Sequence, residues 1–228
     1  MLSERVSLGR MTKQEGIVLG VAGRLFREKG FAATTVRELA TAAGMLPGSL
    51  HYRFPTKESL LVELMERGMT QAIERVRAAI EVENTPLKKM QSALREHLSI
   101  LVEGDDAIYV NLYEFRSVTG TARDRILRLR DAYEALWDGM LHTAVGAGLI
   151  RAGLDLRMVR FLLLGAVNWS AQWYEENQSY TPGEVADAFF GISAFGFCNA
   201  GAGGLRAQSS ERPGVRPTDV FDDGDRSA

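Results

Sequence analysis

Three polar side chains near residue 50 have the types and the spacing to contact DNA. Ser49, Tyr52 and Arg53 stand at positions i, i+3 and i+4, so a helix would carry them on one face. An arginine there can donate two hydrogen bonds to a guanine, and a tyrosine can reach a phosphate or a thymine methyl group. Leu50 and Phe54 fall on the opposite, inward face. The pattern is typical of a helix that enters the major groove.

Neighbouring residues are suited to phosphate groups. Lys57 stands near the start of a following helix, where its charge adds to backbone amides that favour an anion. Thr35 precedes an earlier helix in the same way, and Gly48 allows a close approach of the backbone. Residues 1–60 hold nine Lys/Arg and five Asp/Glu, whereas the rest of the chain holds 18 and 24. A basic N-terminal part on an acidic remainder favours an anionic partner.

The elements that must position these groups begin with a helix over 12–29. Gly30 follows it, where a left-handed C-terminal cap is expected. Thr35 and Glu38 have the spacing of a capping box, which starts a second, short helix. Gly44 ends that helix.

A third helix is predicted over 47–54, with Pro47 at its first position, where the missing N–H costs nothing. Gly44, Met45 and Leu46 join the second helix to the third, and the three elements form a helix-turn-helix pattern. Because such turns also occur in many other helical proteins, the pattern alone leaves DNA binding and plain packing as equal alternatives.

The remainder of the chain is also predicted to be helical, which makes the fold class all-α. Apolar residues recur at helical spacing over 57–82, 87–103, 107–118, 121–147, 155–176 and 183–199. Gly148 and Gly153 mark one of the turns. Residues 200–228 are rich in Gly, Pro, Ser and charge, and are predicted to be a disordered tail. A length of 228 residues with 46% hydrophobic and 25% charged residues suits a globular protein.

The middle helices offer apolar walls with a few polar groups, which is what an amphipathic ligand requires. An arginine in an aromatic-rich stretch, Arg116, can hold a carboxylate or a phosphate. It can equally pair with Glu114 or Asp124, and the aromatic residues can equally belong to the core. The candidate ligand-binding residues are Tyr109, Asn111, Tyr113, Arg116, Trp137 and Asn168.

The last two helices are apolar on more than one face, so each needs a partner surface besides its own core. Two such pairs packed across a two-fold axis would make a four-helix bundle and a homodimer. Trp169, Trp173 and Tyr174 suit either the interface or the ligand site. The candidate interface residues are Leu162, Leu163, Ala166, Val167, Phe189, Phe190 and Phe197.

Other classes of protein receive little support. The histidines His51, His97 and His142 are scattered, and we expect the last two on helix surfaces or half-buried. No nucleotide-binding or nucleophile motif is present, so no enzyme activity, metal or cofactor is expected. A single cysteine, Cys198, suits a reducing cytoplasm. No secretory signal or membrane span is predicted.

The segment TTVRELATAAGMLPGSLHYRFPTKESLL, residues 34–61, resembles the DNA-binding signature of the TetR/AcrR family of repressors. The resemblance implies a homodimer with a helix-turn-helix domain over 1–57, a ligand-binding and dimerisation domain over 58–199, and a palindromic double-stranded DNA operator. It also implies a small-molecule inducer. The residues implied to contact DNA are Thr35, Gly48, Ser49, His51, Tyr52, Arg53 and Lys57.

Three residues depart from the pattern of this family. Leu46 stands where Ser often caps the third helix, His51 where Tyr is usual, and Arg53 where His is common. The operator therefore cannot be transferred from a relative. The departures also leave open a helical ligand-binding scaffold with a degenerate DNA-binding head.

The C-terminal half is similar to one subgroup of this family. The segments RDAYEALW (130–137), LLGAVNWSAQWY (163–174) and TPGEVADAFF (181–190) are similar to regulators of fatty-acid and steroid catabolism. The similarity implies an acyl-CoA thioester as the inducer that releases the repressor from its operator. An unrelated amphipathic or drug-like ligand is the alternative.

Overall fold

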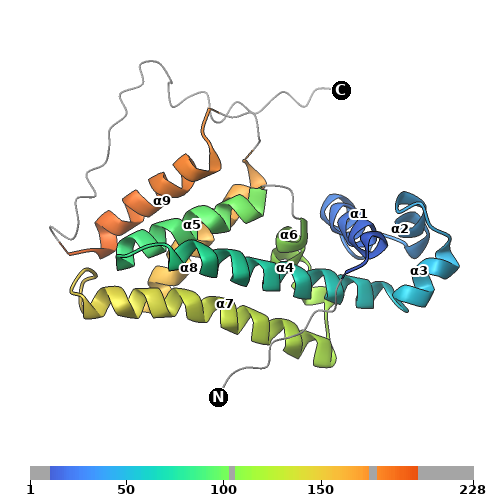
Figure 1. The fold of residues 1–228 in the computed structure, drawn as a ribbon, viewed down its shortest axis with the longest axis horizontal. Coiled ribbons are helices and arrows are strands. Elements are labelled where there is room, and N and C mark those ends of the chain that lie inside the picture. Colours follow the sequence, from blue (N-terminus) through green and yellow to red (C-terminus); the bar gives the residue numbers. More distant parts are fainter. Residues whose placement is uncertain (1–10, 103–105, 175–178, 200–228) are drawn as a thin grey trace.

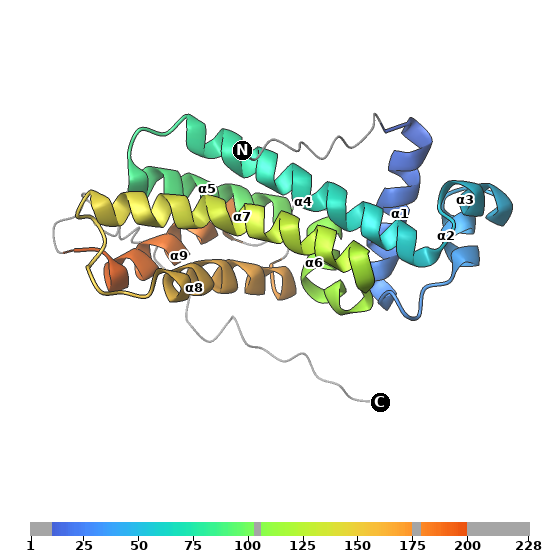
Figure 2. The same ribbon diagram turned by 90° about the horizontal axis from the view of Figure 1, so that it is seen from below.

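The computed structural model describes residues 11–102, 106–174 and 179–199. Within them, Figures 1 and 2 show an elongated helical molecule. The helices are α1 (Lys13–Lys29), α2 (Val36–Ala42), α3 (Pro47–Arg53), α4 (Lys57–Glu81), α5 (Pro86–Val102), α6 (Asp106–Tyr113), α7 (Gly120–Gly146), α8 (Leu156–Trp169) and α9 (Pro182–Phe197), with 3-10 turns η1 (Phe115–Ser117) and η2 (Ser170–Gln172). None of the helices in these ranges is long and apolar enough to cross a membrane.

Helices α1–α3 lie at one end of the long axis, and we call them the head (Figure 1). Thr12 and Thr35 cap α1 and α2 through capping boxes with Glu15 and Glu38. Gly30 ends α1 with a φ of 81°, a backbone conformation that favours glycine. The sequence-predicted capping box at Thr35 and the left-handed residue at Gly30 are both confirmed.

Helix α4 joins the head to the body, by which we mean α5–α9. Its first half contributes Leu60, Leu61 and Met65 to the core of the head. Its second half contributes Met69 and Val76 to the core of the body. The domain boundary that the sequence predicts at residue 57 therefore falls at the first residue of a helix that contributes to both cores. Figure 2 shows this helix running along the head and the body.

Helix α6 packs between α1 and α4. An added Cβ at Gly68 would lie 2.6 Å from the Cβ of Ala107, so α4 and α6 lie too close together for a side chain at this position. The Arg27 guanidinium of α1 also lies 3.1 Å from the Asp106 carboxylate of α6. Movement of α6 is thus coupled to both the head and α4.

Two expected helices are shorter in the structure. The helix expected over 107–118 ends at Tyr113, where the chain enters η1. There, the Glu114 carboxylate accepts hydrogen bonds from the Phe31 backbone N–H and from the Ser117 hydroxyl, which fixes the turn. The helix expected over 155–176 ends at Trp169 and continues as η2.

Candidate DNA interface and ligand site

Helix α3 presents a polar face to solvent. Leu50 is buried against the head, whereas Ser49, His51 and Arg53 are exposed and Tyr52 is 88% exposed. Gly48 is exposed as well, and a Cβ built there would touch nothing within 4 Å. Five of the seven predicted DNA-contacting residues therefore stand on one accessible helix. Its N-cap, Leu46, makes no side-chain cap hydrogen bond, as the sequence predicts.

The Arg53 side chain is held by the start of α1. One guanidinium nitrogen lies 2.8 Å from a Glu15 carboxylate oxygen and donates to the Thr12 hydroxyl at 3.1 Å. Hydrogen bonds from the Thr12 backbone and hydroxyl, together with Arg53, lower the pKa of Glu15 to about 2. The arginine is thus held in one orientation by a half-exposed ion pair, which is weak enough to be exchanged for another partner.

Lys57 has a different role from the phosphate contact predicted from the sequence. Its ammonium donates to the backbone oxygens of Phe31 at 2.6 Å, Thr34 at 2.7 Å and Ala32 at 3.3 Å, and it lies 4.3 Å from the Phe31 ring centroid. An ammonium has three donors. All are used to hold the loop between α1 and α2, so a phosphate contact would require breaking one.

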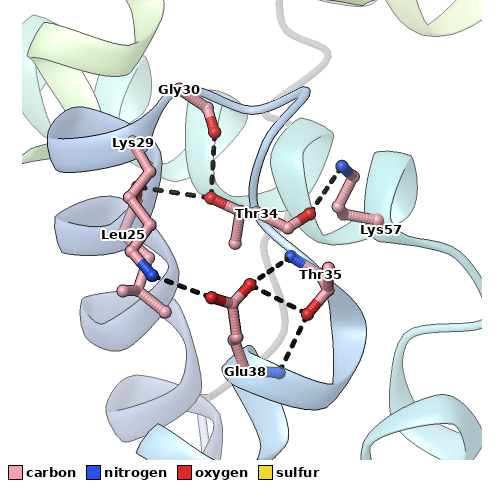
Figure 3. A network of polar contacts seen from close by, with 7 residues as sticks. All are labelled: Leu25, Lys29, Gly30, Thr34, Thr35, Glu38 and Lys57. Atoms are coloured by element: carbon pink, nitrogen blue, oxygen red, sulfur yellow. Dashed lines mark hydrogen bonds and ion pairs between the residues drawn. The ribbon is translucent and has the colours of Figure 1, made fainter.

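Thr35 stands at the exposed N-terminus of α2, in the network that Figure 3 shows. Its hydroxyl and backbone N–H donate to Glu38, which also accepts from Lys29 at 2.8 Å. The Lys29 ammonium and the Thr35 donors lower the pKa of Glu38 to about 2. In the same network, the buried Thr34 hydroxyl lies within hydrogen-bond distance of the backbone oxygens of Gly30, at 2.9 Å, and Leu25, at 3.3 Å. The interlocked bonds fix the start of α2, and a phosphate contact at Thr35 would have to replace the Glu38 carboxylate.

The body encloses a group of polar side chains that we call the polar cluster. Its centre is His97 of α5, whose Nδ1 lies 2.6 Å from the Tyr133 hydroxyl and whose Nε2 lies 2.8 Å from the Asn168 Oδ1. Trp137 and Ser170 are 0% exposed; the Trp137 indole N–H interacts with the Tyr133 hydroxyl, whereas the Ser170 hydroxyl has no hydrogen-bond partner among the described residues. The cluster joins α5, α7, α8 and η2.

The ionisation of the polar cluster follows from its burial. Burial lowers the pKa of His97 and raises the pKa of the Tyr133 hydroxyl, so both groups are neutral near pH 7. An amide oxygen only accepts, so Nε2 of His97 carries the proton and Nδ1 accepts from Tyr133. The surface or half-buried position expected for His97 is wrong, because the side chain is 7% exposed.

The structure brings Trp137 and Asn168 together but places the other predicted ligand residues elsewhere. Asn111 is buried and donates to the oxygens of Met65 and Ala107, which ties α6 to α4. Tyr109 and Tyr113 stack at 4.4 Å on α6, and Arg116 is exposed on η1. These four residues lie at the junction between head and body.

The predicted dimer residues divide into two sets. Leu163, Val167, Phe190 and Phe197 are at most 3% exposed and belong to the core of the protomer, so their assignment to an interface is corrected. Ala166 and Phe189 are partly buried, and Leu162 is 55% exposed. The exposed apolar face, which we call the α8–α9 face, consists of Met158, Phe161, Leu162, Trp169, Ile192 and Phe195.

Comparison with known proteins identifies both parts of the chain. Residues 18–64 match the family described as "Bacterial regulatory proteins, tetR family". Residues 83–196 match "Tetracyclin repressor-like, C-terminal domain". The two matches cover the head with the start of α4, and nearly all of the body.

Three relatives show the nature of this likeness. The chain is 27% identical over 72% of its length to the fatty acid metabolism regulator protein of Bacillus subtilis, of which 84% is covered. It is 28% identical over 81% of its length to the transcriptional repressor KstR2 of Rhodococcus jostii, of which 89% is covered. The crystal structure of AibR with isovaleryl coenzyme A and operator DNA matches with a TM-score of 0.73 and 25% identity, covering 79% of this chain and 97% of that one.

Proposed function

The chain belongs to the TetR family of regulatory proteins, and on that premise we propose that it is a homodimeric repressor whose operator binding is relieved by an acyl-CoA thioester. The observation that carries the DNA-binding half is the exposed polar face of α3 on a fixed helical scaffold. A repressor acts on DNA, so we place it in the cytoplasm.

The operator half of the proposal rests on the geometry of the head. The exposed Ser49, Tyr52 and Arg53 face away from the core of the head, as a major-groove helix requires. Two heads related by a two-fold axis would meet half-sites about 34 Å apart, or a multiple of that spacing, on a palindromic DNA duplex. Arg53 would read a base, and the N-terminus of α2 at Thr35 would meet a phosphate.

The α8–α9 face supplies the surface for the homodimer. Phe195 is 93% exposed and Ile192 74% exposed on α9, beside Trp169 and Leu162 on α8. Large aromatic and aliphatic side chains exposed on two helices that pack together are typical of an interface. Two copies of the α8–α9 pair would bury these side chains in a four-helix bundle.

The polar cluster supports a ligand site inside the body. A buried hydroxyl without a partner among the described residues, that of Ser170, is costly, and a ligand with a polar atom on an apolar frame would satisfy it. AibR binds isovaleryl coenzyme A, as the description of its structure states, and another relative is a regulator of fatty acid metabolism. An acyl group that reaches Trp137 must move α5, α7 and α8 apart. The N-terminal end of α7 lies at the junction between head and body, so this movement can be passed on to the head.

The test is the affinity of the purified protein for labelled DNA taken from upstream of its own gene, measured by fluorescence anisotropy. We expect tight binding that weakens steeply with salt, because phosphate contacts release counterions. A panel of acyl-CoA thioesters should reverse it. Tight DNA binding that no thioester changes would refute the acyl-CoA thioester as the ligand and leave the DNA-binding half of the proposal standing. A protein that selects no sequence from a random pool would refute the repressor.

A further inference from the structure

Two arginines of α7 lie against one aromatic ring at the junction of head and body. The Cζ atom of Arg123 is 4.1 Å from the centroid of the Phe115 ring, and that of Arg130 is 3.9 Å away. The two arginines are seven residues apart, so they share one face of α7. The exposed Arg116 follows Phe115 in the chain. We call Arg123 and Arg130 the arginine cluster.

Within the part of the chain that the structure describes, no carboxylate forms an ion pair with this cluster. Other arginines of the body are paired: Arg95 with Asp187, Arg125 with Glu66, and Arg160 with both Glu134 and Asp138. The neighbouring Glu114 is engaged by the Phe31 backbone and Ser117, and Glu134 by Arg160. Among the described residues, the cluster therefore has no direct ion pair, although the charge of Glu134 also acts on Arg130.

Hydrogen bonds to backbone oxygens hold the guanidinium groups in place, and they occupy only some of the N–H donors. Arg123 donates to the backbone oxygens of Phe115 at 3.3 Å and Val118 at 3.4 Å, and Arg130 donates to the oxygen of Asn111. Each guanidinium has five N–H donors, so most remain free for an anion. Side chains fixed in advance lose less conformational entropy when a ligand binds.

The electrostatics also favour an anion at this place. Burial, followed by the charge of Arg123, lowers the pKa of Arg130, although an arginine stays protonated in proteins. Two like charges beside one ring repel each other, and a bound phosphate would turn this repulsion into attraction to both. Guanidinium groups match the oxygen geometry of phosphates.

The direction of α7 connects this site to the polar cluster. Arg130 is followed by Tyr133 three residues later and by Trp137 seven residues later, on the same side of the helix. The rise from Arg130 to Trp137 is about 10 Å. A charged group at the partly exposed arginines can therefore belong to a molecule whose apolar end lies at the buried polar cluster.

We propose that the arginine cluster binds the phosphate groups of the nucleotide part of the acyl-CoA inducer, an inference that rests on the proposed function. The acyl group then lies at the polar cluster, and the pantetheine arm follows α7 between the two sites. One molecule would contact both the body and the η1 junction, which packs on the head through Glu114 and Phe31.

The test compares two thioesters of the same acid on the full-length protein by calorimetry. One is the acyl-CoA that binds most tightly in the panel, and the other is the acyl-N-acetylcysteamine thioester, which has no phosphates. Arg123→Gln and Arg130→Gln should each weaken acyl-CoA binding at least tenfold and leave binding of the phosphate-free thioester unchanged. Arg128→Gln, an exposed change on the same helix, is the matched control.

The outcomes separate this inference from the proposed function. Absence of acyl-CoA binding by the unaltered protein would overturn both. Binding by the unaltered protein that both variants retain, or equal losses for both thioesters, would overturn the inference alone. So would a loss of operator affinity with thioester binding intact, because the phosphates would then belong to DNA. If the variants do not fold, the test is whether adenosine 3′,5′-bisphosphate displaces acyl-CoA from the unaltered protein. Displacement supports phosphate binding at the arginine cluster, and failure to displace acyl-CoA overturns it.

Discussion

The head and the body place their functional polar groups in opposite ways. On α3, Arg53 and Tyr52 stand at the surface, held by contacts that leave them accessible. In the body, His97 and Trp137 are enclosed by helices far apart in the chain. The proposed DNA-binding surface is thus formed in advance, whereas the proposed ligand site must open to admit a ligand. An inducer can act only if it binds the open body better than the closed one.

The largest effect is expected from a substitution in the core of the body. Leu163 is 1% exposed and its neighbour Leu162 is 55% exposed. Leu163→Ala should lower the free energy of unfolding by about 2–5 kcal/mol through a cavity. Leu162→Ala should chiefly weaken the dimer. Urea denaturation at several protein concentrations separates the two effects, and a larger protomer loss for Leu162 would contradict the assigned faces.

A change in the head should leave the body untouched. Arg53→Ala is expected to weaken operator binding by about 1–3 kcal/mol and to relax the preference at one base pair. Acyl-CoA affinity should not change, because the residue lies outside the body. Anisotropy on a set of single-base operator variants measures this. An even loss across all sequences would instead make Arg53 a phosphate contact.

The role of Lys57 can be separated from phosphate binding. Lys57→Met removes three charge-assisted hydrogen bonds to the loop between α1 and α2, so we expect the head to lose about 1–3 kcal/mol of stability. Amide hydrogen exchange over residues 31–34 should accelerate. If Lys57 instead binds DNA, exchange would stay unchanged and the salt slope of binding would fall by about one.

The smallest effect is a pH dependence from the polar cluster. Burial lowers the pKa of His97 in the folded protein, so the unfolded chain binds a proton more readily. Stability should therefore fall as the pH drops below about 6.5, the value of a free histidine. The Tm of the unaltered protein and of His97→Gln, compared at pH 7.5 and 5.5, tests this. Equal decreases in both proteins would exclude His97 as the cause.

The head could be predicted from the sequence because its signals are local. The capping box at Thr35, the turn at Gly44 and the spacing of Ser49 and Arg53 all lie within a few residues of their partners. The hydrogen bonds of Lys57 could not be predicted, because its acceptors lie 23–26 residues away, in a loop whose position depends on tertiary packing.

The ligand site depends on contacts that no short spacing reveals. His97 meets Tyr133 and Asn168, which are 36 and 71 residues away. One signal was available: His97 continues the stripe of Met90, Leu94 and Leu101 on α5, which marks it as inward-facing. On α8 and α9 no such signal exists, because each helix has apolar residues on more than one face. The spacing of its apolar residues therefore does not distinguish core residues from interface residues.

In the proposed mechanism, a ligand bound in the body lowers the affinity of the head for DNA. The most direct measurement is the affinity of the protein for its own upstream DNA at fixed salt, with and without a saturating acyl-CoA that calorimetry shows to bind. We predict that the thioester lowers this affinity at least tenfold, which corresponds to a coupling of about 1.4 kcal/mol. An unchanged affinity with the thioester bound would contradict the claim.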